Sequence, residues 1–137
     1  MDEIKFPRIF AIDIDNLETE KRDHDHIWGD EAWLVNDRKL NIGCKFLTIF
    51  PGFTSSKHKH LTKSEYFIVL AGELKLREWN PGGHHHEVVL EQGRRYFIPK
   101  NIYHRFETGS KQFVLLLEVS TFEDEQTEKE LKSERLY

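Results

Sequence analysis

Short runs of apolar and β-branched residues, separated by turn residues, recur along almost the whole chain. Closely spaced runs of this kind are typical of the strands of β-sandwiches and β-barrels. We therefore predict an all-β domain of about nine or ten short strands. The predicted strands cover residues 9–14, 31–36, 44–50, 65–70, 72–79, 86–90, 94–99, 104–106 and 111–120.

The connections between these runs carry two further predictions. Ala71 and Gly72 separate two apolar runs, and this pair indicates the turn of a β-hairpin. Residues 20–26 (EKRDHDH) all carry charged or imidazole side chains, and this composition favours a loop.

The end of the chain departs from the strand pattern. Ser120 and Thr121 are followed at three residues by Glu123 and Asp124, which is the spacing of a helix capping box. Acidic side chains near the start of a helix are favoured by its dipole. We predict a short C-terminal helix over about residues 121–133, lying on the outside of the domain.

Composition limits the possible functions. The 137 residues suit one domain, here taken as 1–137. The net charge is −4 and the basic residues are scattered, which argues against a nucleic-acid partner. No apolar run approaches the ~20 residues of a membrane span, and charges and Pro7 interrupt the N-terminal stretch, which therefore does not resemble a signal peptide. A single cysteine, Cys44, excludes an internal disulfide, and we expect a soluble, cytoplasmic protein.

A possible metal site begins in residues 52–72 (GFTSSKHKHLTKSEYFIVLAG). His58 and His60 would share one face of a strand, because side chains alternate with period two. A turn can bring Glu65, at the head of the next strand, back beside them. An inward carboxylate is costly unless it is paired or ligating, and a divalent metal between imidazoles and carboxylate would meet that need. His104, after a strand and a proline turn, is the best candidate for a further ligand.

These residues carry a resemblance to the cupin family. Residues 52–72 fit the first cupin motif without deviation: glycine, five residues, HxH, four residues, glutamate, six residues, glycine. Residues 93–108 resemble the second motif. They depart from it at Asn101, where the family usually has glycine, and at Thr108, where asparagine is common. Neither departure falls on a ligand position.

The resemblance covers the motif core, residues 52–108, and implies a jelly-roll β-barrel with one divalent transition metal. The implied ligands are His58, His60, Glu65 and His104. Such a donor set suits Mn, Fe, Zn, Ni or Co without distinguishing among them. Two other histidine clusters are not assigned to the metal site. Residues 84–86 (HHH) are assigned to a polar hairpin edge, and residues 23–26 (DHDH) to a charged loop without a partner strand.

A second resemblance concerns function. Residues 27–36 (IWGDEAWLVN) and 114–121 (VLLLEVST) resemble segments of small sugar-isomerase-like cupins. That group includes relatives of D-lyxose isomerase and of the cupin domain of type II mannose-6-phosphate isomerases. The resemblance implies a metal-dependent sugar or sugar-phosphate isomerase or epimerase that works through an enediol.

Several residues could supply that chemistry. Glu118 lies inside an apolar strand; facing inward, its pKa would rise with burial and it could act as the general base, whereas on an edge it would be a surface charge. Lys45 either holds a sugar oxygen or phosphate from the interior, or faces solvent. Trp33 either forms a wall for the sugar ring or packs in a core or dimer contact. Further substrate-binding candidates are Lys57, Tyr66, Tyr96 and Tyr103, and more weakly Arg94.

Other functions stay open for this chain. Three histidines and a glutamate also suit an Fe(II)-dependent dioxygenase of a small molecule, and a non-catalytic small-molecule-binding cupin would keep the same fold. The expected partner is a small-molecule substrate, a sugar in the isomerase reading, with no nucleic acid and no membrane. Residues 8–14 (RIFAIDI) could add a strand to a partner's sheet, so we expect a homodimer.

Overall fold

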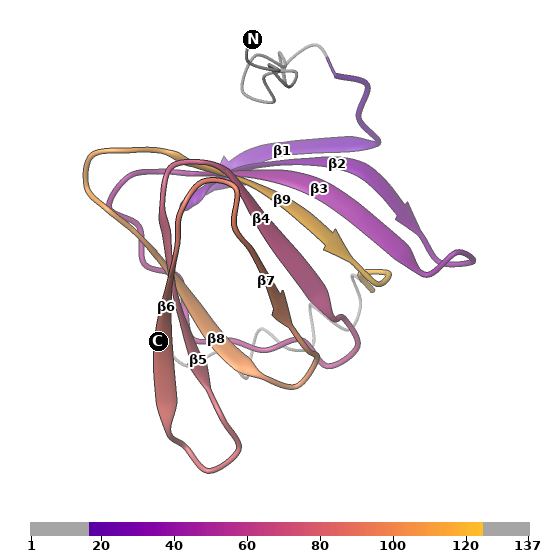
Figure 1. The fold of residues 1–137 in the computed structure, drawn as a ribbon. Helices are drawn as coiled ribbons and strands as arrows, with labels where there is room; N and C mark the ends of the chain where they lie inside the picture. The colour runs from indigo at the N-terminus through magenta and orange to yellow at the C-terminus, as the bar shows by residue number, and fades with distance from the viewer. Residues whose placement is uncertain (1–16, 125–137) are drawn as a thin grey trace, which may run out of the picture.

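The structure, a computed structural model, describes residues 17–124 and contains strands without helices in that part of the chain (Figure 1). Every strand pair is antiparallel. A six-stranded sheet has the order β1-β2-β3-β9-β4-β7, and a three-stranded sheet has the order β6-β5-β8. The strands are β1 (Lys21–His26), β2 (Gly29–Asp37), β3 (Ile42–Ile49), β4 (Glu65–Ala71), β5 (Leu74–Trp79), β6 (His85–Leu90), β7 (Arg95–Ile98), β8 (Tyr103–Thr108) and β9 (Val114–Ser120).

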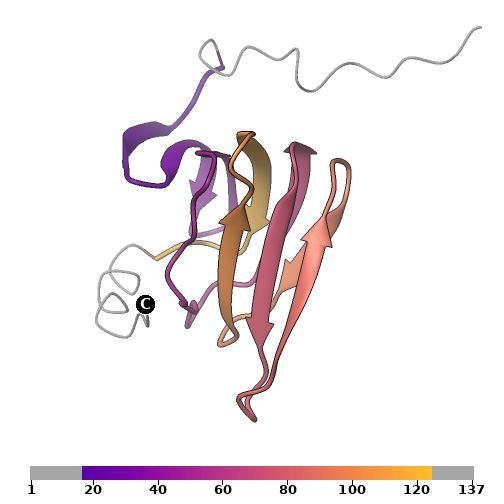
Figure 2. The same ribbon diagram turned by 90° about the vertical axis from the view of Figure 1, so that its left-hand side faces the viewer.

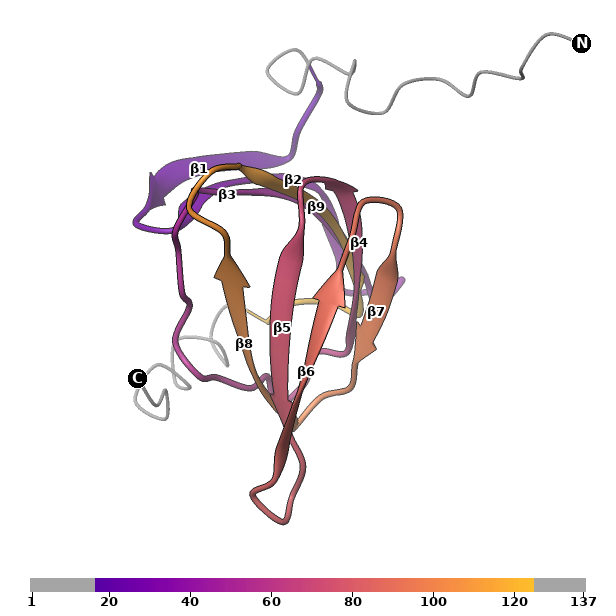
Figure 3. The same ribbon diagram turned by 60° about the vertical axis from the view of Figure 1, so that its left-hand side comes forward.

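The two sheets face each other and enclose one main hydrophobic core (Figure 3). Alternating side chains supply much of it: β9 buries every second residue, and β4 buries Glu65, Phe67 and Val69 on its inner face while Tyr66 is 43% exposed. Phe67 and Phe106 meet edge to face across the interior, with ring centroids 4.8 Å apart. The all-β barrel prediction is therefore confirmed, with two antiparallel sheets packed as in a jelly roll.

The predicted hairpin at Ala71 and Gly72 is wrong. β4 belongs to the six-stranded sheet and β5 to the three-stranded sheet, which faces the viewer in Figure 2, so the chain turns a corner between the sheets here (Figure 3). Gly72 has a φ of +83°, and a Cβ on it would lie 2.6 Å from the carbonyl oxygen of Phe113. The glycine is thus required by the corner and by the close approach of the β8–β9 loop.

The charged stretch that was predicted as a loop forms strand β1. It pairs with β2 from Lys21 opposite Trp33 to His26 opposite Gly29, with an irregularity after Asp23. β1 lies at the edge of its sheet, where charged side chains reach solvent and protect against further strand pairing. The sequence pattern missed it because the rule used for strands requires apolar alternation.

The predicted C-terminal helix is not seen where it can be checked. Residues 121–124 are not helical, and residues 125–133 lie outside the described part of the chain, as does the predicted strand 9–14. The Thr121 hydroxyl accepts a hydrogen bond from the Ser64 backbone N–H instead of capping a helix. Among residues 17–124 no helix is long and apolar enough to cross a membrane.

Candidate metal centre

Backbone pairing brings the first and last predicted ligands together. His58 and His104 form an isolated antiparallel bridge, with N–H to carbonyl distances of 3.0 and 2.8 Å. The ring centroids of His58 and His104 lie 4.4 Å apart, and the His60 ring lies 5.4 Å from the first and 5.5 Å from the second. The three imidazoles offer nitrogen atoms within 4.8 Å of one another, a grouping that could hold a metal ion.

Hydrogen bonds orient two of the rings. His58 Nδ1 lies 2.8 Å from the carbonyl oxygen of Ser56, and His104 Nδ1 lies 2.9 Å from that of Ile102. Since a carbonyl oxygen only accepts, each Nδ1 carries the proton and each Nε2 lone pair is left for a ligand. Burial, together with the neighbouring His58 and His60, lowers the pKa of His104 well below its usual value. The neutral imidazole is the form that binds a metal.

Glu65 completes the cluster from the start of β4. Its side chain is 1% exposed, and its Oε1 lies 3.5 Å from His60 Nε2 and 3.4 Å from His104 Nε2. Both carboxylate oxygens of Glu65 and the Nε2 of His104 are buried without a hydrogen-bond partner. Buried polar atoms are normally satisfied, so Glu65 Oε1 and His104 Nε2, which lie 3.4 Å apart, fit a bound cation, whereas Glu65 Oε2 already has an ion pair with Lys63.

Lys63, which the sequence analysis did not single out, lies beside Glu65. It is 2% exposed, and its Nζ lies 3.3 Å from Glu65 Oε2, 3.3 Å from Glu118 Oε2 and 2.6 Å from Glu123 Oε1. Burial alone would lower the pKa of Lys63, but these three carboxylates, Glu118 most strongly, raise it well above its usual value. Lys63 is therefore a buried ammonium that connects the predicted ligand Glu65 to other acids.

Lys45 faces the interior, where it joins the same charge network. Its Nζ lies 3.3 Å from Glu31, 3.4 Å from Glu123 and 3.7 Å from Glu118. The ammonium also lies 4.3 Å from the centre of the Trp33 ring, which is only 5% exposed and donates from its Nε1 to Glu31. Trp33 thus packs against Lys45 rather than forming an open wall.

Glu118 faces the interior as expected, but its predicted rise in pKa is not found. Burial acts in the expected direction, yet the ammonium groups of Lys45 and Lys63 outweigh it, and the pKa of Glu118 falls to about 2. The carboxyl whose pKa rises is Glu65, to about 7, chiefly through burial with Glu118 adding to it. The lysine partners, which residue spacing did not reveal, explain the difference.

The remaining substrate-binding candidates lie in three different places on the barrel. Lys57 and Tyr103 lie on the outer face of the small sheet, where the Lys57 ammonium sits 4.4 Å from the centre of the Trp79 ring and 5.3 Å from that of Tyr103. Tyr66 lies on the outer face of the large sheet against Phe97. Tyr96 alone among the four points between the sheets, while Arg94 is exposed.

Comparison with known families agrees with this geometry. Residues 45–120, more than half of the chain, match the family described as cupin domain. The chain belongs to this family. No curated protein matches it.

Solved cupin-like structures resemble the barrel at low sequence identity. The capsular polysaccharide assembling protein CapF from Staphylococcus aureus superposes with a TM-score of 0.64 at 18% identity, over 72% of this cupin and 29% of that chain. KdgF from Halomonas sp. superposes with a TM-score of 0.64 at 10% identity, over 77% of this cupin and 91% of the KdgF chain. An oxalate oxidase superposes with a TM-score of 0.61 at 19% identity, over 73% of this cupin and 54% of the oxidase chain. The cupin thus spans less than a third of CapF, and these likenesses concern the fold.

Two residues of the buried charge network, Lys63 and Glu123, escaped the sequence analysis for identifiable reasons. Lys63 lies two residues before Glu65, and extending the alternation of β4 backwards would have placed it on the inward face. Glu123 was assigned to the first turn of a helix. In the structure its backbone is not helical, and the Asn36 side chain makes two hydrogen bonds of 3.0 Å with it.

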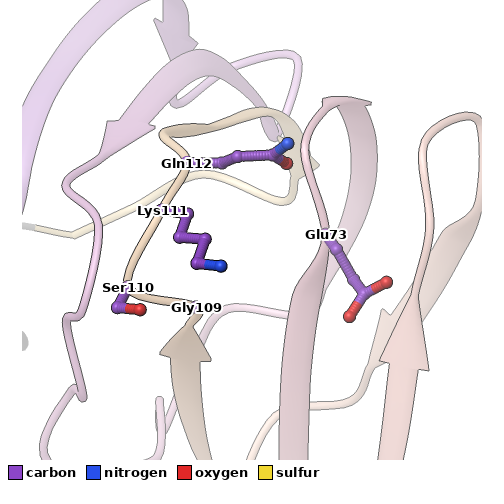
Figure 4. Close-up of a pocket in the computed structure, with 5 residues that line it drawn as sticks. All are labelled: Glu73, Gly109, Ser110, Lys111 and Gln112. Carbon is purple, nitrogen blue, oxygen red and sulfur yellow. The ribbon is translucent and has the colours of Figure 1, made fainter.

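A second group of possible metal ligands and a surface pocket lie outside this centre. Because β1 pairs with β2, Asp23, His26 and Glu31 come together as a second group that could hold a metal ion, although Glu31 is already bound to Lys45 and Trp33. A surface pocket lined by Glu73 and residues 109–112 lies between the β4–β5 and β8–β9 connections (Figure 4). It is at the end of β8 opposite to His104 and takes no part in the metal centre.

Proposed function

We propose that this cupin is a metal-dependent sugar or sugar-phosphate isomerase or epimerase that moves a proton between adjacent carbons. The observation that carries the proposal is the buried network in which the metal-side residue Glu65 is joined through Lys63 to the carboxylate of Glu118. A pocket for dioxygenase chemistry can be drier, whereas isomerisation needs ionisable groups inside the barrel.

His58, His60, Glu65 and His104 would hold the metal, a divalent Mn, Fe, Zn, Ni or Co ion. When bound, the metal would act as a Lewis acid toward sugar oxygens. The Nδ1 hydrogen bonds of His58 and His104 keep their Nε2 atoms turned toward that position. Glu65 would enter this set from the first position of β4.

Glu118 is the general base that removes the carbon-bound proton of the substrate. Its low pKa means that the carboxylate, the form that accepts a proton, is present throughout the physiological range. The carboxylate removes the proton from the hydroxyl-bearing carbon to leave an enediol, and returns it to the neighbouring carbon. Lys45 and Lys63 keep the carboxylate in place, and their positive charges weaken it as a base. This weakening favours substrates whose α-proton is already acidified by a polarised carbonyl.

The structural neighbours give limited support. CapF is described as assembling a capsular polysaccharide, which is a carbohydrate function. The oxalate oxidase is a reason to keep Fe(II)-dependent oxygen chemistry as the second candidate, since three imidazoles and one carboxylate also suit that metal. A small-molecule-binding role without turnover is the third.

The test begins with the purified protein, its metal content by mass spectrometry, and a panel of aldoses, ketoses and their phosphates. We expect isomerisation or epimerisation, lost by about 100-fold or more in Glu118→Gln and retained in Glu91→Gln, an exposed carboxylate. Oxygen consumption with bound iron would favour the dioxygenase. Ligands that raise the melting temperature without turnover would favour the binding module.

A further inference from the structure

Three side chains from different strands form a hydrogen-bonded triad outside the ligand set. The phenol of Tyr96 on β7 donates to Glu78 Oε2 on β5. The Nε2 of His86 on β6 lies 3.1 Å from the Tyr96 oxygen and 3.3 Å from Glu78 Oε2. The triad joins the two sheets, because β7 belongs to the large sheet and β5 and β6 to the small one. His86 is therefore more than a polar hairpin edge.

The triad faces the same interior as the metal ligands. Glu78 is the cross-strand partner of His104, and antiparallel partners on one face hold their Cβ atoms about 5 Å apart. On the large sheet, Phe67 pairs with Tyr96 on one side and with Glu118 on the other. Tyr96 and Glu118 therefore flank Phe67 in a single row of inward side chains. In this row Phe67 thus lies between the phenol of Tyr96 and the carboxyl group of Glu118.

Burial and hydrogen bonding divide the triad by role. The Glu78 side chain is 13% exposed, whereas that of His86 is 58% exposed. Glu78 Oε2 accepts from Tyr96, and within residues 17–124 no hydrogen bond reaches its Oε1. Burial first, and then the hydrogen bond and charge of Glu78, raise the pKa of the Tyr96 phenol. The phenol thus stays protonated and orients the carboxylate, leaving Oε1 for another donor.

We propose that Glu78, positioned by Tyr96 and His86, is a second acid–base group of the site, a role that rests on the proposed isomerase or epimerase function. An aldose–ketose conversion moves two protons, one between carbons and one between oxygens. Glu118 moves the carbon-bound proton. Glu78 Oε1 accepts the proton of the substrate hydroxyl and delivers it to the neighbouring carbonyl oxygen, so the carboxylate is regenerated in each turnover.

A purely structural latch between the sheets is the competing explanation, and the variants separate the two. Glu78→Gln keeps the size of the side chain and loses its proton-accepting ability. Tyr96→Phe keeps the carboxylate and loses its orienting donor. His85→Gln is the matched control, because His85 neighbours His86 in sequence but faces outward against the Trp79 ring.

The experiment measures three quantities on metal-loaded protein: metal content, isomerisation rate, and deuterium uptake from D₂O into recovered substrate. We expect Glu78→Gln to keep its metal and lose about 100-fold in kcat, with deuterium uptake reduced much less. Tyr96→Phe should lose about 10-fold, and His85→Gln should match the wild type. On metal-free protein, ultraviolet titration should show the pKa of Tyr96 falling toward its ordinary value in Glu78→Gln.

Each contrary result has a definite meaning. Wild-type kcat in Glu78→Gln overturns the assignment while leaving the proposed function intact. An unchanged pKa of Tyr96 in that variant overturns the hydrogen-bonded arrangement. Equal loss of deuterium uptake in Glu78→Gln and Glu118→Gln overturns the division of the two protons. Absence of any sugar turnover by the wild type overturns the proposed function and this assignment together.

Discussion

The backbones of His58 and His104 exchange both of their hydrogen bonds, although the two residues belong to separate motifs of the sequence. This bridge holds the loop that carries His58 and His60 against β8. The imidazoles are therefore positioned by main-chain pairing before any metal is present. Such preorganisation reduces the conformational entropy lost on binding.

The metal ligands give the first prediction. Replacing His104 with Gln removes a buried Nε2 that has no hydrogen-bond partner in the described chain, so metal affinity should fall by about 100-fold or more. Isothermal titration with Zn²⁺ and Mn²⁺ measures the effect, and His85→Gln should bind as the wild type does. Equal affinity in His104→Gln would place the metal elsewhere.

Lys63 gives the second prediction. Replacing it with Met removes the ammonium beside Glu65, while Glu118 and Glu123 keep Lys45, and we expect a loss of about 3–5 kcal/mol in the free energy of unfolding because Glu65 stays buried. Urea unfolding of the metal-free protein measures it. The control is Lys75→Met, since Lys75 is 43% exposed and its ion pairs should contribute less than about 1 kcal/mol. Similar losses in both variants would contradict a special role for Lys63.

Acid stability gives the third prediction. The pKa of Glu118 is about 2 in the folded chain and 4.5 as its ordinary value. A carboxyl with a lowered folded pKa stabilises the protein above its unfolded pKa, and this contribution is lost as the pH falls from about 4.5 toward 2. The loss should be on the order of 3 kcal/mol, measured by urea unfolding across that range. Glu118→Gln should flatten the profile; an unaltered slope would count against the network.

The corner between the sheets gives the fourth prediction. Gly72→Ala should cost about 2–4 kcal/mol, because φ is +83° and the added Cβ would lie 2.6 Å from the Phe113 carbonyl oxygen. Gly83 has a φ of +84° with no atom near its Cβ position, so Gly83→Ala isolates the backbone term, about 1 kcal/mol. Thermal unfolding compares them. Equal costs would mean that the close approach of the β8–β9 loop contributes nothing.

The local pattern of residues was enough for most strands and for the shared face of His58 and His60, whereas the resemblance to the two cupin motifs joined Glu65 and His104 to them. Period-two alternation decides which side of a strand is buried, and spaced glycines and prolines decide where the chain turns. These are short-range effects, so one sequence contains them. The same rules failed at β1, whose charges are tolerated because the strand lies at a sheet edge.

Tertiary structure decided which buried charges meet. Glu118 was predicted to have a raised pKa because burial is local information, whereas Lys45 and Lys63 reach it from other parts of the chain and lower the pKa to about 2. The contact of Tyr96 with Glu78 and His86 likewise depends on tertiary packing, because β7 belongs to the large sheet whereas β5 and β6 belong to the small sheet that faces it. Sequence alone determined the alternation that turns these side chains inward. Only the packing of two sheets determined their partners, because Coulomb and hydrogen-bond energies depend on distances in space that residue spacing does not encode.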